Sequence, residues 1–108
     1  MRKPDTLQGT LDLLILSTLE REPNHGFGIT LHIQTVSDGM LAVEEGSLYP
    51  ALRRLERGKL IKGEWKTTPN GRRARYYRLT KAGLTRLAEV QKSWDVLTRS
   101  VGKVLRFV

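Results

Sequence analysis

The chain has 108 residues, with 19 Lys and Arg against 11 Asp and Glu, and therefore a formal net charge of +8 at pH 7. A chain of this length buries roughly two-thirds of its extended surface, so 39% hydrophobic residues suffice for one small folded domain and exclude a wholly disordered tail. The absence of cysteine excludes disulfides, thiolate zinc sites and cysteine nucleophiles. The basic excess indicates a polyanionic partner.

The sequence predicts a cytoplasmic protein. Its longest apolar stretch, residues 11–19, is interrupted by Asp12, Ser17 and Thr18 and falls short of the roughly 20 residues that span a bilayer. The charged N-terminus is not followed by an apolar segment with a small-residue cleavage site, as a secretory signal would be.

The positive charge is concentrated in one third of the chain. Between Ser47 and Leu79 there are ten basic residues and two acidic ones, whereas the nine remaining basic residues are balanced by nine acidic ones. A solvated surface spreads its charge, but a compact cationic patch is typical of a nucleic-acid-binding protein.

Two helices are expected in the N-terminal part. The first begins at a Thr6 or Thr10 cap and runs to about Arg21, and it is apolar around nearly its whole circumference. Such a helix is either the centre of the core or partly covered by a second chain. The second runs from about His25 to Val36.

Smaller features of this part carry expectations of their own. Ser37-Asp38-Gly39 ends the second helix. We expect His25 to help start that helix and His32 to lie on the surface. Asp12 either caps a helix or pairs with a basic residue across a dimer.

The third helix is expected from Ser47, as N-cap, to Arg57, with Pro50 in its first turn and Gly58 ending it. A spacing of 100° per residue places four residues on one apolar face: Leu48, Ala51, Leu52 and Leu55. The opposite face carries Tyr49, Pro50, Arg53 and Arg57, with Arg54 on its flank.

Two strands, about residues 60–66 and 73–79, are expected to form a hairpin. The Asn70-Gly71 pair between them is a strong turn signal, because both residues accept a positive φ. Aromatic residues interleave with the cations here. They could form a base-stacking platform for single strands, but hairpin aromatics usually close the core, and we expect this of Trp65 and Tyr77.

A last helix is expected from about Lys81 to Leu105, capped by Thr80, and it is too long for the body that precedes it. Its apolar residues recur close to a heptad pattern, which favours a seam with a second copy over packing on its own body. Residues 1–80 then form the DNA-binding part and residues 81–108 the dimerisation helix, within a single compact unit.

Three helices followed by a two-stranded ribbon, with cations on the third helix and at the ribbon tip, is the element order of a winged helix-turn-helix. The predicted fold class is therefore mainly α with a small β-hairpin, a winged helix-turn-helix plus a long C-terminal dimerisation helix. Four ordered blocks of sequence also resemble the PadR family of bacterial transcriptional regulators. They are residues 7–12 (LQGTLD), 25–29 (HGFGI), 44–56 (EEGSLYPALRRLE) and 71–80 (GRRARYYRLT), which together cover nearly the whole chain.

The resemblance implies a homodimeric transcriptional repressor of the short branch of that family, in which one helix makes the dimer. The expected function is binding of a pseudo-palindromic double-stranded DNA operator. The third helix would lie in the major groove, and the hairpin of residues 60–79, called the wing, would lie at the adjacent minor groove. The expected DNA-binding residues are Ser47, Tyr49, Pro50, Arg53, Arg54, Lys66, Asn70, Gly71, Arg72, Arg73 and His25.

Several of these residues have a second reading. Ser47 could cap its own helix, and Tyr49 could pack on the wing. Arg53 and Arg54 more often contact phosphate than read bases. The wing tip could be a solvated turn, although the mutual repulsion of its cations favours an anionic partner.

The expected dimer interface consists of Leu7, Leu11, Leu14, Leu84, Leu87, Gln91, Trp94, Leu97 and Val101. Trp94 beside its mate could leave a slot for a flat apolar effector, so a multidrug or phenolic-compound sensor is one alternative function. A winged-helix protein-interaction module is another. We expect no enzyme, cofactor or metal site, because no catalytic set can be assembled and the two histidines have no carboxylate at ligand spacing.

Overall fold

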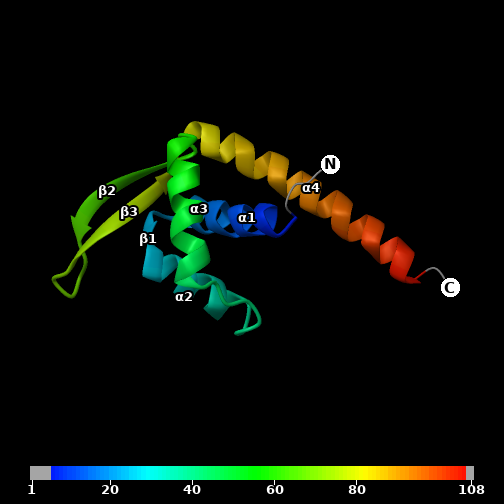
Figure 1. Ribbon diagram of the computed structural model, residues 1–108, viewed down its shortest axis with the longest axis horizontal. Helices are drawn as coiled ribbons and strands as arrows, with labels where there is room; N and C mark the ends of the chain where they lie inside the picture. The colour runs from blue at the N-terminus through cyan, green and yellow to red at the C-terminus, as the bar shows by residue number, and fades with distance from the viewer. Residues whose placement is uncertain (1–5, 107–108) are drawn as a thin grey trace.

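The computed structural model describes residues 6–106 of the chain, with side chains described from residue 9 onward. Its elements, in chain order, are α1 (Thr6–Arg21), β1 (Asn24–His25), α2 (Gly26–Val36), α3 (Glu45–Arg57), β2 (Ile61–Thr67), β3 (Arg73–Leu79) and α4 (Lys81–Arg106) (Figure 1). The expected fold class, mainly α with a small β-hairpin, is confirmed.

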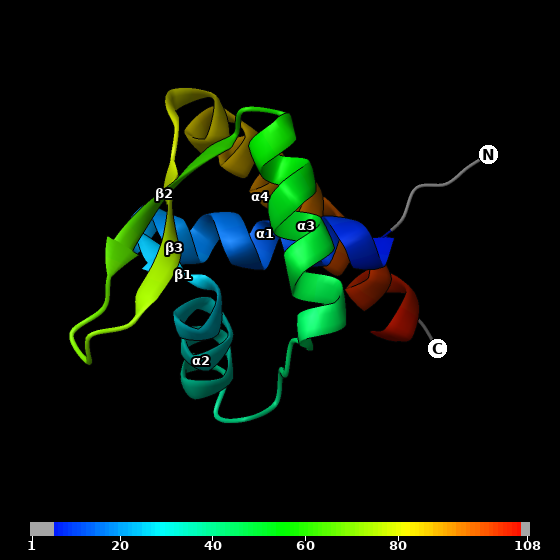
Figure 2. The same cartoon turned by 60° about the vertical axis from the view of Figure 1, so that its left-hand side comes forward.

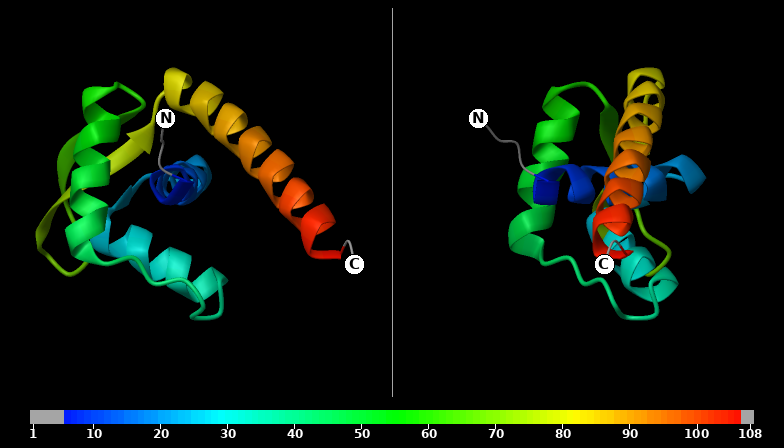
Figure 3. Two further views of the ribbon diagram at one scale, coloured as in Figure 1. Left: turned by 45° about the vertical axis from the view of Figure 1, so that its right-hand side comes forward. Right: turned by 90° about the vertical axis from the view of Figure 1, so that its right-hand side faces the viewer.

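Helix α1 occupies the centre of the molecule. Viewed along its axis, it lies between α3 and the hairpin on one side and α4 on the other, with α2 below (Figure 3). This position explains why α1 is apolar nearly all round: it packs against α2, α3, α4 and β3. The reading of α1 as a central core helix is therefore correct.

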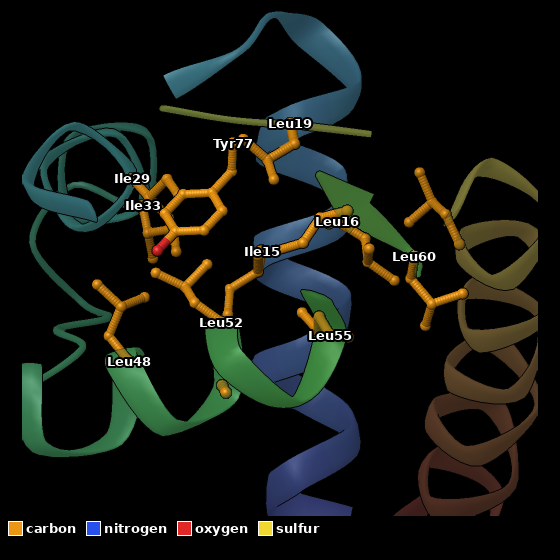
Figure 4. Packing of buried hydrophobic residues seen from close by; sticks show 13 residues of the cluster. Ile15, Leu16, Leu19, Ile29, Ile33, Leu48, Leu52, Leu55, Leu60 and Tyr77 are labelled. Atoms are coloured by element: carbon orange, nitrogen blue, oxygen red, sulfur yellow. The ribbon is translucent and has the colours of Figure 1, made fainter. Parts of the chain in front are cut away.

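The core is built where α1, α2, α3 and the base of the sheet meet (Figure 4). Ile15, Leu16, Ile29, Leu48 and Leu52 are fully buried. The four residues predicted for the inner face of α3 are all buried, as the 100° spacing requires.

The sheet has three antiparallel strands in the order β1-β3-β2. Strand β1 was not expected: Asn24, which precedes the predicted second helix, and His25, predicted as its start, pair with Tyr77 and Tyr76 of β3. Strands β2 and β3 pair from Ile61 opposite Leu79 to Thr67 opposite Arg73. The hairpin projects beyond the body (Figure 2).

The hairpin turn differs from the expected tight Asn-Gly turn. Residues 68–72 form a five-residue loop, and Gly71 alone of the Asn-Gly pair has a positive φ, of 87°. The Gly71 N–H donates to the Thr68 carbonyl over 2.9 Å, so Pro69 and Asn70 occupy the centre of the turn. Proline fixes φ near −65° at such a position, which excludes the turn type that needs positive φ at two successive residues.

Helix α3 begins three residues earlier than expected, when its observed N-cap is compared with the predicted one. Glu44 is its N-cap, and the Glu44 carbonyl accepts hydrogen bonds from the N–H groups of Ser47 (3.0 Å) and Leu48 (2.9 Å). The predicted capping role of Ser47 is wrong, since Ser47 lies inside the first turn. Pro50 lies in the second turn of α3 rather than in the first. Because proline has no N–H group, the helix lacks the hydrogen bond to the carbonyl of the exposed Gly46.

The start of α4 is as predicted. The Thr80 hydroxyl accepts a hydrogen bond from the Gly83 N–H over 3.0 Å. Gly83 is buried against the backbone of Leu60: a Cβ atom there would lie 2.0 Å from the Leu60 carbonyl oxygen. Glycine is thus required for α4 to approach the sheet this closely.

Four further side-chain expectations have clear outcomes. Tyr77 is in the core, as predicted, but Trp65 is 57% exposed and its predicted core role is wrong. Leu87, predicted to face a second copy, is 3% exposed and belongs to the core of its own chain. His32 is half-buried rather than on the open surface.

None of the helices within residues 6–106 combines the length and the hydropathy that a membrane-spanning helix needs.

Candidate nucleic-acid interface

The outer face of α3 is open to solvent. Tyr49, Pro50, Arg53 and Arg57 are all exposed, opposite the buried face. Ser47 is exposed as well, in the first turn. An α-helix with its side chains is about 10–12 Å in diameter, which matches the roughly 12 Å width of the major groove of B-form DNA.

Arg54 is held by an ion pair to α1. Its guanidinium donates a hydrogen bond to the Asp12 carboxylate, and the two side chains are 38% and 20% exposed. Asp12 therefore has a partner in its own chain, and the expectation of a pair across a dimer is corrected. Burial raises the pKa of Asp12 above its ordinary value of 3.8, and Arg54 opposes that shift only in part.

The beginning of α2 adjoins the open face of α3. The N-cap of α2 is His25, whose Nδ1 accepts a hydrogen bond from the Gly28 N–H over 3.0 Å, so the expected helix-starting role is confirmed. The His25 ring also meets the Tyr76 ring edge to face, with centroids 5.0 Å apart. A Cβ atom at Gly26 would lie 2.8 Å from the Tyr49 hydroxyl oxygen, so the Tyr49 side chain lies across this helix end.

The wing loop exposes its cations on an ordered turn. Lys66, Asn70, Gly71, Arg72 and Arg73 are all exposed. The Thr68 N–H donates to the Arg72 carbonyl over 2.6 Å, and the Arg72 N–H donates to the Thr68 hydroxyl over 3.2 Å. The loop backbone is therefore closed on itself while its basic side chains point outward.

An ion pair joins the wing to α3. Arg75 of β3 donates a hydrogen bond to the Glu56 carboxylate over 2.5 Å. The Arg75 guanidinium also lies over the Trp65 ring, 5.9 Å from its centroid, and the Arg73 guanidinium lies 5.4 Å from it. The interleaving of aromatic and basic residues in β2 and β3 was the only sequence signal for this cluster, and it was read as core packing.

On the far side of the molecule, the C-terminal half of α4 exposes several apolar side chains. Helix α4 is roughly 39 Å long, and its C-terminal half extends beyond α1 (Figure 1). Trp94, Leu97 and Val101 are 38%, 40% and 45% exposed. A groove of about 130 Å³ lies between α1 and α4, lined by Gly9, Thr10, Leu13, Val90, Ser93, Trp94 and Leu97.

The other expected interface residues are placed as follows. Leu84 and Gln91 of α4 are exposed, and Leu11 and Leu14 of α1 are half-buried. Leu7 lies outside the residues whose side chains are described. Within residues 6–106, no three His, Asp or Glu side chains are grouped so that they could hold a metal ion.

The order of these elements, with the second and third helices followed by a paired ribbon, defines the class of winged helix-turn-helix proteins. Within that class, the sequence model of the transcriptional regulator PadR-like family matches residues 15–89. The chain belongs to this family, whose members are DNA-binding transcriptional regulators, and it is therefore a regulator of this general kind.

Individual relatives support the assignment. A transcriptional regulator of Mycobacterium tuberculosis is 38% identical over 77 residues, which are 71% of this chain and 68% of that protein. The crystal structure of a PadR family transcriptional regulator from Eggerthella lenta is 39% identical, with 94% of this chain and 86% of that chain covered and a TM-score of 0.76. A PadR-like regulator from Bacillus cereus is 31% identical, with 94% and 97% covered and a TM-score of 0.79.

Proposed function

We propose that the chain is a homodimeric repressor that binds a pseudo-palindromic double-stranded DNA operator. In each protomer α3 enters the major groove, and the wing reaches the adjacent minor groove. The observation that carries the proposal is the sidedness of the molecule: the exposed cations of α3 and the wing gather at one end, and the exposed apolar face of α4 extends to the other (Figure 1).

Within this proposal, the position of each arginine in α3 and the wing determines its role. Arg53, on the open face of α3, reaches phosphates and base edges. Arg54 is turned toward Asp12 and acts mainly by fixing α3 on α1. Arg72 and Arg73 of the wing contact the backbone that flanks the minor groove, and the ordered turn presents them without further folding.

The dimer is supported by the face of α4 that carries Leu87. In the N-terminal half of the helix this face packs on the body, and farther along it continues as Trp94 and Val101, which are 38% and 45% exposed in the part of the chain that the structure describes. A second copy related by a two-fold axis would bury this face and place two α3 helices on one side. Repression would follow from steric exclusion at the promoter.

The test is selection of bound duplexes from a random or genomic pool, followed by competition with heparin. The proposal predicts enrichment of a two-fold symmetric sequence that heparin displaces only in excess. Enrichment of no sequence, together with equal competition by heparin and duplex, would contradict it and favour a basic module that binds acidic proteins.

The groove beside Trp94 favours a second candidate, an effector site for a small aromatic compound. Its lining is mostly apolar, and its volume of about 130 Å³ in one protomer would be enlarged by the corresponding face of a second copy. Quenching of Trp94 fluorescence by planar cationic or phenolic compounds, with release of bound duplex, is the expected result. Absence of quenching across a broad panel would contradict this candidate.

A further inference from the structure

Trp65 points toward α3 although the core does not cover it. Residues that stand opposite one another in an antiparallel pair share a face of the sheet, and Trp65 stands opposite Arg75, two residues from Gly63 opposite Tyr77. Tyr77 is buried in the core, and Arg75 reaches Glu56 of α3. The indole therefore lies on the α3 side of the wing, 57% exposed.

Arg75 is the reason that the indole stays outside the core. A Cβ atom at Gly63 would lie 2.7 Å from Nε of Arg75, so the Arg75 side chain occupies the space above Gly63. Its guanidinium is 6.0 Å from the Tyr77 ring centroid and 5.9 Å from that of Trp65. With Arg75 fixed by Glu56, the Trp65 side chain is held at the outer end of this stack.

The side chains around Trp65 indicate the kind of surface that the indole would contact. The Arg73 guanidinium lies 5.4 Å from the Trp65 ring centroid, so an exposed aromatic ring lies next to an exposed cation. The sugar-phosphate backbone of DNA offers the complement, apolar deoxyribose edges alternating with phosphates. If α3 enters the major groove, the strand that separates this groove from the wing's minor groove passes between α3 and the wing.

We propose that Trp65 is a further DNA-contacting residue, whose indole packs on a deoxyribose of that strand while Arg73 pairs with the neighbouring phosphate. Arg75 and Glu56 act as positioning residues that hold the indole. The inference rests on the proposed function, and it adds a contact that is apolar and independent of base sequence. A mixed-sequence duplex is therefore a sufficient probe.

The test compares the wild-type chain with Trp65→Ala and Trp65→Phe. Binding is measured by the fluorescence anisotropy of a labelled mixed-sequence duplex of about 30 base pairs at low salt. Trp65→Ala is expected to weaken binding about fivefold to twentyfold, whereas Trp65→Phe, which keeps an aromatic ring, stays within about threefold. Far-UV circular dichroism checks that both variants fold.

Salt dependence separates an apolar contact from the loss of a cation. Trp65→Ala removes no charge and is expected to keep the wild-type slope of log K against log salt. Arg73→Ala is expected to flatten that slope by about 0.9, the value for one phosphate contact. A Trp65→Ala slope as flat as that of Arg73→Ala would overturn the direct contact, because the indole would then act only by placing the cation.

Tryptophan emission provides a direct readout, because the chain has two tryptophans and Trp94 is present in both wild type and Trp65→Phe. The difference between their duplex titrations reports Trp65, and it is expected to saturate together with the anisotropy. Duplex binding without a Trp65 signal, or equal binding by wild type and Trp65→Ala, overturns the inference and leaves the proposed function intact.

The two remaining outcomes are also decisive. Tighter binding of a single strand than of the duplex, lost in Trp65→Ala, would identify stacking on unpaired bases and overturn the duplex contact. Binding of neither the mixed-sequence nor a selected duplex by the wild-type chain would overturn the proposed function and this inference together.

Discussion

Asp12 is a carboxylate on the largely apolar helix α1, and two features of its surroundings shift its pKa in opposite directions. Burial among apolar neighbours raises its pKa, while the pair with Arg54 favours the charged form and offsets that shift only in part. The sequence marked Asp12 as unusual but could not name its partner, because Arg54 is 42 residues away and faces Asp12 only once α3 packs on α1.

The raised pKa predicts a pH dependence of stability. The native state binds the Asp12 proton more tightly than the unfolded state, so its stabilising contribution is present below about pH 4 and is lost as pH rises through the raised pKa. The free energy of unfolding of wild type minus that of Asp12→Asn should therefore fall as pH rises, then level off. Urea titrations from about pH 3 to pH 8 measure it. A difference that grows with pH would show that Arg54 outweighs burial.

Gly83 is required by close packing rather than by its φ. Gly83→Ala would place a Cβ atom 2.0 Å from the Leu60 carbonyl oxygen, so α4 must shift away from the sheet. We expect a loss of about 1–3 kcal/mol in the free energy of unfolding, measured with urea.

Gly46→Ala is the matched control, because a Cβ atom there meets nothing within 4 Å and alanine favours the helix by up to about 1 kcal/mol. Equal destabilisation by both variants would contradict the packing argument.

At the scale of elements, local patterns predicted α3 well and its start poorly. The apolar face of α3 follows from spacing alone, so its four buried residues were predicted correctly. The position of the first turn depends on the path of the preceding loop, which spacing does not predict. The helix therefore begins at Glu44, which makes no side-chain capping hydrogen bond, although serine is the better capping residue and Ser47 was available.

Strand β1 and the position of Trp65 depend on contacts that no local pattern contains. A two-residue strand has no alternation to detect, and Asn24 and His25 become a strand only because the free edge of β3 lies beside them. Trp65 and Tyr77 lie on the same face of the hairpin, so the alternation of side chains predicts a core position for both. Only the structure shows that Arg75 fills the space between the indole and the core. The candidate site was therefore predicted by residue type and charge, but not by side-chain partner.

The wing is expected to act as an electrostatic element. Replacing Arg72 and Arg73 together by Ala removes two exposed cations, and we expect the slope of log K against log salt to flatten by about 1.8. Fluorescence anisotropy of a labelled duplex over a salt series measures the slope.

The control for the wing is replacement of Arg99 and Lys103 by Ala. These residues are near the C-terminal end of α4, opposite the wing (Figure 1), so their loss should leave the slope unchanged. An unchanged slope in the wing variant would remove the wing from the interface.

At the scale of the whole molecule, α4 is longer than the body it packs on. The heptad-like pattern identified its apolar face, but it could not show where the body stops covering that face. Leu87 is buried and Trp94, two turns farther along, is exposed, so the boundary falls between them.

Val101→Glu tests whether that exposed face joins two copies. A carboxylate on each side of the two-fold seam would be desolvated beside its mate, and we expect the dimer dissociation constant to rise at least about a hundredfold. Sedimentation velocity measures it. Val96→Glu, on the opposite face of α4, is the control and should remain dimeric. Equal sedimentation of both variants and wild type would place the dimer contact elsewhere.

The proposed function requires above all that two copies present α3 and the wing together to one duplex. A hydroxyl-radical footprint on a selected duplex tests this directly. We expect protected segments related by a two-fold axis, with half-site centres one helical turn of about 34–36 Å, or a multiple of it, apart. A single protected segment without two-fold symmetry would show that the chain does not bind the duplex as a symmetric pair.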